Sequence, residues 1–194
     1  MASPTSKIFY VASALVVALA IFIGVFLFAT GQFSSAKPVG GPFKLTDDNG
    51  QPVSDATFKG EPYLIYFGYT HCPDVCPTTL FELSEVMKAL GKDADRTAVL
   101  FVTIDPERDT AAVMKDYLSN FDRHLMGATG DPKTVRAVEK EFNVFAQKVP
   151  AKDGDYSMNH SSEIYLMDKQ GHFVEAFDLK RKPKVSAAEL RKYM

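Results

Sequence analysis

The sequence predicts an α/β domain that is preceded by a single N-terminal transmembrane helix. Within residues 42–194, short buried-strand patterns alternate with helical patterns, and the chain's two cysteines stand where the first central strand ends and a helix begins. An uncharged apolar run at residues 8–29 predicts the membrane helix. The 194 residues and net charge of -2 fit one ordinary domain with an added segment, and the lack of a basic excess argues against a nucleic-acid partner.

The apolar run from Ile8 to Ala29 contains 22 residues and no charge. A helix of that length extends roughly 33 Å, enough for a hydrocarbon core of about 30 Å. A cleaved signal peptide is the alternative, with Ser34-Ser35-Ala36 as a candidate cleavage site, but its apolar region is typically only about 7–15 residues long. We therefore expect an uncleaved anchor at residues 1–30, a linker at 31–41 and the domain at 42–194.

The cations around the apolar run predict its orientation. Lys7 and the amino terminus precede it, and Lys37 is the first cation after it, which favours an N-terminus inside and a domain outside the membrane. On the exported side, disulfides persist. Because the run begins at residue 8, it leaves no room for a long transit peptide. We expect a single-pass protein of the bacterial cytoplasmic membrane with its domain in the periplasm, rather than one of the mitochondrial inner membrane.

The domain's elements follow from local patterns. An Asn-Gly turn between short alternating runs predicts a first hairpin, and continuous aliphatic and aromatic runs predict two buried central strands. The expected hairpin covers 43–53, the strands 63–67 and 97–104, the helices 77–90, 111–121 and 131–142, a polar loop 147–157, a closing hairpin 161–177 and a last helix 186–194. With right-handed crossovers, this order covers both faces of the sheet and is similar to a thioredoxin-like fold.

Cys72 and Cys76 are the only cysteines, and their spacing of about one helical turn puts both sulfurs on one side of a helix. The start of a helix favours the thiolate form. A thiolate pair can close a disulfide, exchange with another disulfide or bind a soft metal. The gap is wider than the Cys-x-x-Cys of thioredoxin-type enzymes and leaves room for a metal between the sulfurs, without excluding redox exchange.

His160 is the candidate third ligand, because it lies between a polar loop and the start of a strand that we expect beside the cysteine turn. Two thiolates and one imidazole form a soft site that suits Cu(I), and imidazole also supports Cu(II). Structural zinc sites usually need four protein ligands. The pattern alone also fits a histidine that only makes hydrogen bonds. Asp105 follows a central strand near the thiols, and we expect a supporting role for it.

Four motifs together resemble the Sco/SenC family of copper-binding proteins involved in cytochrome c oxidase assembly, and the resemblance covers about residues 37–190. It implies copper ligation by Cys72, Cys76 and His160. Asn159 stands where family members usually carry Asp, so it can support the imidazole by hydrogen bonding but without charge. The motifs are Tyr66-Phe67-Gly68-Tyr69-Thr70, Cys72-Pro73-Asp74-Val75-Cys76-Pro77, Ile104-Asp105-Pro106-Glu107-Arg108-Asp109-Thr110, and His160-Ser161-Ser162 followed by Tyr165-Leu166.

The resemblance implies a membrane-tethered copper chaperone rather than an enzyme. Such a protein delivers copper to the binuclear centre of cytochrome c oxidase subunit II, with other copper chaperones as further candidate partners. The alternative is a thiol–disulfide oxidoreductase that uses a Cys72–Cys76 disulfide to reduce client cysteines, and redox sensing also stays open. A purely structural disulfide is disfavoured, because its loop is so short that the entropic gain is small.

Overall fold

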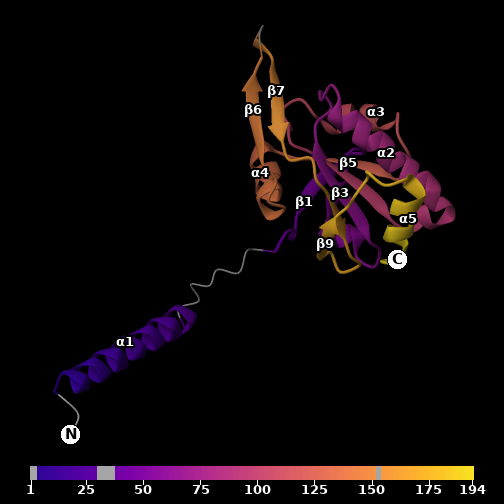
Figure 1. Cartoon of the computed structure of the whole chain (residues 1–194). Coiled ribbons are helices and arrows are strands. Elements are labelled where there is room, and N and C mark those ends of the chain that lie inside the picture. The colour runs from indigo at the N-terminus through magenta and orange to yellow at the C-terminus, as the bar shows by residue number, and fades with distance from the viewer. Residues whose placement is uncertain (1–3, 30–37, 152–153) are drawn as a thin grey trace. The chain divides into compact units, whose positions relative to one another are not determined.

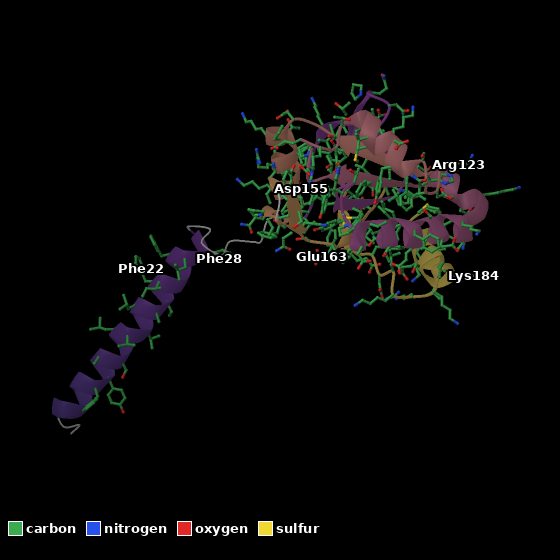
Figure 2. The ribbon with its side chains drawn as sticks, turned by 90° about the horizontal axis from the view of Figure 1, so that it is seen from above. Phe22, Phe28, Arg123, Asp155, Glu163 and Lys184 are labelled. Atoms are coloured by element: carbon green, nitrogen blue, oxygen red, sulfur yellow. The ribbon has the colours of Figure 1, made fainter. Side chains whose placement is uncertain are left out.

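The computed structural model describes residues 4–29, 38–151 and 154–194 (Figure 1). The chain divides into two compact units, Met1–Lys37 and Pro38–Met194. The first contains helix α1 (Pro4–Ala29), from which apolar side chains such as Phe22 and Phe28 project (Figure 2). In the described part of the chain, no helix combines the length and apolar character needed to cross a membrane. The candidate cleavage site and most of the expected linker fall at 30–37, outside the described residues.

A seven-stranded sheet forms the centre of the second unit, in the order β2-β1-β5-β4-β3-β8-β9. Strands β3, β4 and β5 run parallel, while β1 and β8 join their outer edges antiparallel. All of β3 is buried, as its continuous apolar run predicts. The strands are β1 (Lys44–Asp47), β2 (Pro52–Ser54), β3 (Tyr63–Gly68), β4 (Ala98–Thr103), β5 (Leu125–Thr129), β8 (Ile164–Met167) and β9 (Phe173–Ala176).

Helices cover both faces of this sheet. Tyr66 and Phe67 are consecutive in β3, so their side chains point to opposite faces. Tyr66 contacts Cys76 of α2, whereas Phe67 packs against Phe142, just after α4, with ring centroids 5.4 Å apart. The helices are α2 (Val75–Leu90), α3 (Ala111–Leu118), α4 (Pro132–Glu141) and α5 (Pro183–Arg191), with short 3-10 turns at η1 (Asp55–Phe58) and η2 (Gly91–Arg96). The predicted thioredoxin-like α/β architecture is confirmed (Figure 1).

Helix boundaries differ from the predictions in ways that local chemistry explains. Helix α2 begins at Val75, two residues before the expected Pro77, so Cys76 lies in its first turn. Thr110 caps α3 by accepting a hydrogen bond from the N–H of Val113. Helix α5 begins at Pro183, which suits a first helical position, rather than at the predicted residue 186.

Two regions of strand were not predicted. Strand β5 forms where no element was expected, and β6 (Ala146–Pro150) with β7 (Tyr156–His160) replaces most of the predicted polar loop. These last two strands pair antiparallel as a separate two-stranded sheet. The prediction of a loop is wrong for residues 147–150 and 156–157, while the described residues 151, 154 and 155 between the two strands belong to no strand and residues 152–153 lie outside the described residues. The hairpin matters for the site because His160 is the last residue of β7.

Candidate metal centre

The two cysteines flank the junction between β3 and α2. Cys72 lies in the connecting turn and is half-buried, whereas Cys76 lies in the first turn of the helix and is fully buried. The backbone N–H of Cys76 donates a hydrogen bond to Cys72 Sγ at 3.3 Å. Since the first N–H groups of a helix have no partner within it, this one is available to a sulfur. The start of α2 thus supplies a hydrogen-bond donor to Cys72.

Gly68, the last residue of β3, leaves the space that Cys76 occupies. A Cβ at this position would lie 2.8 Å from Cys76 Sγ and 2.7 Å from the ring of Phe101. Both distances are too short for any side chain to be accommodated without movement. The sulfur of Cys76 therefore packs directly against the backbone of the strand.

Burial controls the acidity of Cys76. It raises the pKa of this thiol to about 12, and hydrogen bonds from the Tyr69 backbone and the Tyr66 hydroxyl oppose the increase only in part. Desolvation outweighs the helix N-terminus at this position. The expectation that the helix start favours a thiolate is therefore wrong for Cys76. A metal that binds this sulfur must displace its proton.

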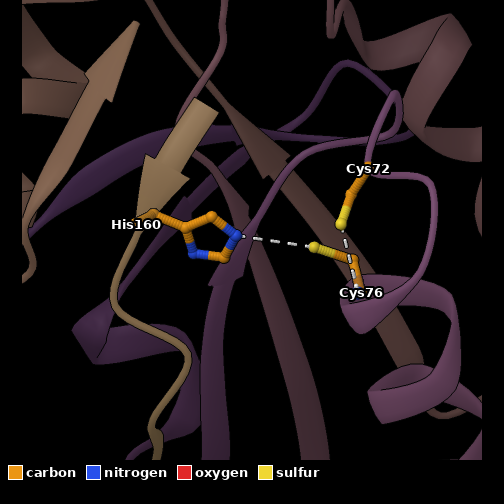
Figure 3. A group of neighbouring side chains, drawn as sticks. All are labelled: Cys72, Cys76 and His160. Atoms are coloured by element: carbon orange, nitrogen blue, oxygen red, sulfur yellow. Dashed lines mark hydrogen bonds between the residues drawn. The ribbon is translucent and has the colours of Figure 1, made fainter. Parts of the chain in front are cut away.

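The imidazole of His160 faces the sulfurs with a free lone pair. Its Nε2 lies 3.8 Å from Cys76 Sγ (Figure 3), while its Nδ1 lies 2.6 Å from the carbonyl oxygen of Ser161. A carbonyl only accepts, so Nδ1 carries the proton and Nε2 is left as an acceptor or ligand. Burial lowers the pKa of His160, which also favours the neutral ring. One donor atom each from Cys72, Cys76 and His160 lies within 4.8 Å of the others.

Tyr69 holds the other side of the imidazole. Its ring packs edge-on against His160, with centroids 5.9 Å apart at 86°. Its hydroxyl accepts the backbone N–H of Met158 at 3.3 Å, two residues before His160 in β7. Two contacts from the residue that follows β3 therefore fix the end of β7 against the cysteine turn.

A family model described as SCO1/SenC matches residues 31–194. The chain belongs to this family. It is 40% identical over 148 residues to an SCO2-like protein of Rickettsia felis, covering 75% of this chain and 72% of that protein. It is also 40% identical over 141 residues to the mitochondrial protein SCO2 of Saccharomyces cerevisiae, covering 71% of this chain and 47% of that one. The family resemblance inferred from the sequence motifs is thereby confirmed.

Among solved structures of Sco proteins, the fold is similar to that of Bradyrhizobium japonicum ScoI with copper bound. The TM-score is 0.79 and the sequence identity 58%, over 80% of this chain and 99% of that one. The chain is therefore similar to both bacterial and mitochondrial members of the family.

In this SCO1/SenC domain, Asp105 connects the loop after β4 to the strand that carries His160. Its Oδ1 accepts the hydroxyl of Tyr156 at 2.8 Å, and its other oxygen accepts the Nε–H of Arg108. Arg108 in turn donates to the carbonyl of Tyr156 at 3.0 Å and lies over its ring, 3.8 Å from the centroid. Because Tyr156 begins β7, this network fixes one end of the strand and His160 lies at the other. Asp105 is not among the converging donor atoms.

Asn159 lies on the far side of β7 from the imidazole. The strand alternates between half-buried Tyr156, Met158 and His160 and exposed Ser157 and Asn159. His160 is oriented instead by the hydrogen bond that its Nδ1–H donates to the carbonyl oxygen of Ser161. Sequence reasoning missed this partner because every residue has a backbone carbonyl, so no residue type signals it.

Asp109 is a second site-supporting residue that sequence reasoning did not identify. It is fully buried and accepts the N–H and hydroxyl of Thr70, at 3.1 and 2.6 Å, and the hydroxyl of Thr103 at 2.6 Å. A carboxylate with three donors ties the turn before Cys72 to the end of β4. Because Thr110 caps α3, the carboxylate of Asp109 is available for the turn.

Proposed function

We propose that this protein is a membrane-tethered copper chaperone that binds one copper ion as cargo through Cys72, Cys76 and His160. The observation that carries the proposal is the convergence of one donor atom from each residue within 4.8 Å. Two thiolates select Cu(I), and the imidazole extends the site to Cu(II). Family membership supports copper rather than zinc, since the similar ScoI of Bradyrhizobium japonicum has copper bound.

Release of the cargo follows from the unequal exposure of the two sulfurs. Cys72 is half-buried, whereas Cys76 is fully buried. An incoming thiolate of the client attacks the metal from the side of Cys72, which leaves first. Cys76 and His160 are displaced afterwards, so the copper is never without ligands. The protein acts as a carrier and not as a catalyst.

The client is subunit II of cytochrome c oxidase with its binuclear copper centre, and other copper chaperones supply the ion. Membership of the SCO1/SenC family supports this assignment. Residues 1–30 anchor the protein, residues 31–41 link the anchor to the domain, and residues 42–194 form the copper-binding domain. The uncharged run of residues 8–29 with Lys7 before it supports a single-pass anchor in a bacterial cytoplasmic membrane and a domain in the periplasm.

Copper titration of the full chain in detergent tests the proposal. The reduced protein should bind one equivalent, and Cu(II) should give a thiolate-to-copper charge-transfer band. The His160→Ala variant should bind copper at least about 10-fold more weakly, because it loses a ligand. The His172→Ala variant is the control, since that imidazole is 78% exposed and far from the cysteines in the fold. A wild-type protein that binds no stoichiometric copper would refute the proposal.

Thiol–disulfide exchange is the second candidate function, and it is favoured by two free thiols whose sulfurs lie within 4.8 Å. In this reaction Cys72 attacks a client disulfide, and Cys76 then displaces the client as a dithiol while the Cys72–Cys76 disulfide forms. Two electrons and two protons pass to the client. This function predicts that His160→Ala retains activity without metal, while Cys72→Ala and Cys76→Ala both abolish it.

A further inference from the structure

Tyr66 is a buried tyrosine whose hydroxyl reaches the metal centre. It lies in the middle strand β3, with its ring fully enclosed. The hydroxyl donates a hydrogen bond to Cys76 Sγ at 3.6 Å, and the side chain of Thr79, in the next part of α2, is a further hydrogen-bond partner. A buried phenol needs such partners, and here one of them is a sulfur of the site.

The sulfur has little freedom to leave this hydrogen bond. Gly68 lies two residues after Tyr66 and therefore on the same face of β3. A Cβ at Gly68 would be only 2.8 Å from Cys76 Sγ, so the sulfur already touches the strand. The same sulfur faces Nε2 of His160 at 3.8 Å. Strand backbone, phenol and imidazole together enclose it.

The two sulfurs thus receive different hydrogen bonds. Cys72 Sγ accepts a backbone N–H, which every residue at position 76 except proline would provide. Cys76 Sγ accepts, in addition to a hydrogen bond from the Tyr69 backbone, a side-chain hydroxyl that depends on the residue at position 66. Only the hydrogen bond from the Tyr66 hydroxyl is therefore set by the choice of a side chain.

We propose that Tyr66 is a positioning residue that adjusts how strongly the Cys76 sulfur donates electrons to copper; this inference rests on the proposed copper-binding function. A hydrogen bond to a metal-bound thiolate withdraws electron density from the sulfur and tunes the redox potential of the metal. With two thiolates, the Cu(I) site carries one more negative charge than the Cu(II) site. Because a hydrogen-bond donor stabilises the more negative form more strongly, Tyr66 favours Cu(I) over Cu(II).

The test compares Tyr66→Phe with Tyr117→Phe in the full chain. Both tyrosines pack against Phe101, with centroids 5.8 and 6.2 Å from it, and each substitution removes one buried oxygen. The Tyr117 hydroxyl has no hydrogen-bond partner among the described residues, which makes it the matched control.

In Tyr66→Phe, the charge-transfer band of the Cu(II) form should move to longer wavelength. The ratio of Cu(I) to Cu(II) affinity should fall about 10-fold, which corresponds to about 59 mV in the copper potential. Tyr117→Phe should match the wild type in both readouts.

Three results would overturn the inference. One is a folded Tyr66→Phe protein with an unchanged charge-transfer band and affinity ratio, and another is an equal shift in Tyr117→Phe.

The third result comes from the metal-free protein, in which two thiols and one disulfide interconvert with two electrons and two protons. The midpoint potential of this couple should fall in Tyr66→Phe, because the reduced Cys76 sulfur loses the hydrogen bond from the Tyr66 hydroxyl. An unchanged potential would contradict the role of this hydrogen bond. This measurement separates the two proposals, since a wild-type protein that binds no copper refutes the chaperone function alone.

Discussion

At the scale of single residues, the arrangement of the three candidate metal donors depends on Gly68. Cys76 Sγ occupies space that any other residue at position 68 would fill with its own Cβ. The helix that carries Cys76 therefore approaches the strand closely enough for the Tyr66 hydroxyl and the His160 imidazole to reach the same sulfur. The absence of a side chain determines where the sulfur lies.

The substitution Gly68→Ala should destabilise the protein and disturb the centre together. The added methyl group would lie 2.7 Å from Phe101 and 2.8 Å from Cys76 Sγ, so both neighbours or the strand backbone must move. Overpacking of this kind costs about 1–3 kcal/mol in the free energy of unfolding. Urea unfolding and Cu(I) competition measure the two effects. Gly24→Ala is the control, because a Cβ there meets nothing within 4 Å. Wild-type stability in Gly68→Ala would contradict the close approach.

The residues that meet at the centre were predictable to different degrees. Cys72 and Cys76 are the only thiols in the chain, so they could be predicted as ligands from their residue type and spacing. His160 could be predicted as a candidate because it precedes a strand that was expected beside the cysteine turn. The partners that orient them were not predictable. Ser161 acts through a carbonyl that every residue has, and Tyr66, inside an apolar run, could not be distinguished from an ordinary core residue.

At the scale of elements, the β6–β7 hairpin brings the imidazole to the cysteines, and Arg108 ties that hairpin to the loop after β4. The guanidinium donates to Asp105, to Asp155 at 3.1 Å and to the carbonyl of Tyr156 at 3.0 Å. Its position 3.8 Å from the centre of the Tyr156 ring adds a cation–π contact. The Arg108 side chain thus joins the loop after β4, which belongs to the main sheet, to the β6–β7 hairpin, which forms a separate sheet.

The substitution Arg108→Lys should loosen the hairpin without removing any metal donor. Lysine keeps the charge but cannot form the same set of planar contacts. We expect a loss of about 2 kcal/mol in unfolding free energy and a decrease in copper affinity of less than about 10-fold. Thermal unfolding and copper competition provide the measurements. Arg123→Lys is the control, since that arginine also pairs with an aspartate, at 2.7 Å, but its side chain is 76% exposed. Equal effects of both substitutions would argue against the role of Arg108.

Glu139 of α4 gives the domain a defined pH dependence. Burial raises its pKa from 4.5 to about 7, and nearby Arg136 opposes this only partly. The folded state therefore binds more protons than the unfolded state between pH 4.5 and about 7, so this residue's contribution to stability decreases as the pH rises through that range. Above it, the folded protein carries a buried charge.

The substitution Glu139→Gln should remove the destabilisation that the buried charge of Glu139 causes at high pH. It should stabilise the protein by about 2 kcal/mol near pH 8 and have little effect near pH 4.5. Urea unfolding at the two pH values measures the difference. Glu82→Gln, which changes an exposed carboxyl on α2, should leave the pH dependence unaltered. A gain from Glu139→Gln of the same size at both pH values would show that titration is not the cause.

The elements that the sequence failed to predict lack the usual signals for physical reasons. Four of the five residues in β6 are exposed, so this strand buries no apolar face and shows no alternating pattern. Strand β5 contains Gly127, where a Cβ would lie 3.0 Å from Leu118 and 3.1 Å from Met114 of α3. This close packing favours a glycine in the strand, whereas glycine in a sequence is normally a sign of a turn or an irregularity. The central strands and helices, by contrast, have continuous apolar or 3.6-residue patterns and were predicted.

At the scale of the whole molecule, the two compact units differ in composition and in secondary structure. Met1–Lys37 contains one apolar helix, and Pro38–Met194 contains the sheet, its helices and the three metal-donor candidates. Among the described residues, the buried hydrophobic core of the second unit extends from Phe43 to Leu190. The buried core and the proposed anchor therefore belong to separate units of the chain.

Removal of residues 1–37 should leave a soluble domain that unfolds at the same temperature and binds copper with the same affinity as the full chain. The full chain should sediment with membranes and resist extraction by high salt, because an apolar helix is not held by charge. Fractionation followed by detergent extraction makes the comparison. A full chain found in the soluble fraction would contradict the proposed anchor, whatever the copper result.

The distance along the chain between the donors has a consequence for the lifetime of the protein. Cys76 and His160 are 84 positions apart, and His160 belongs to a hairpin outside the main sheet. An ion that joins them closes a long loop and binds only the folded state, which it stabilises by about 2.7 kcal/mol when the free ion is at 100 times its dissociation constant. Proteases cut opened chains, so the loaded carrier should survive digestion longer than the empty one. After it delivers copper, the protein would then be degraded faster than the copper-bound form.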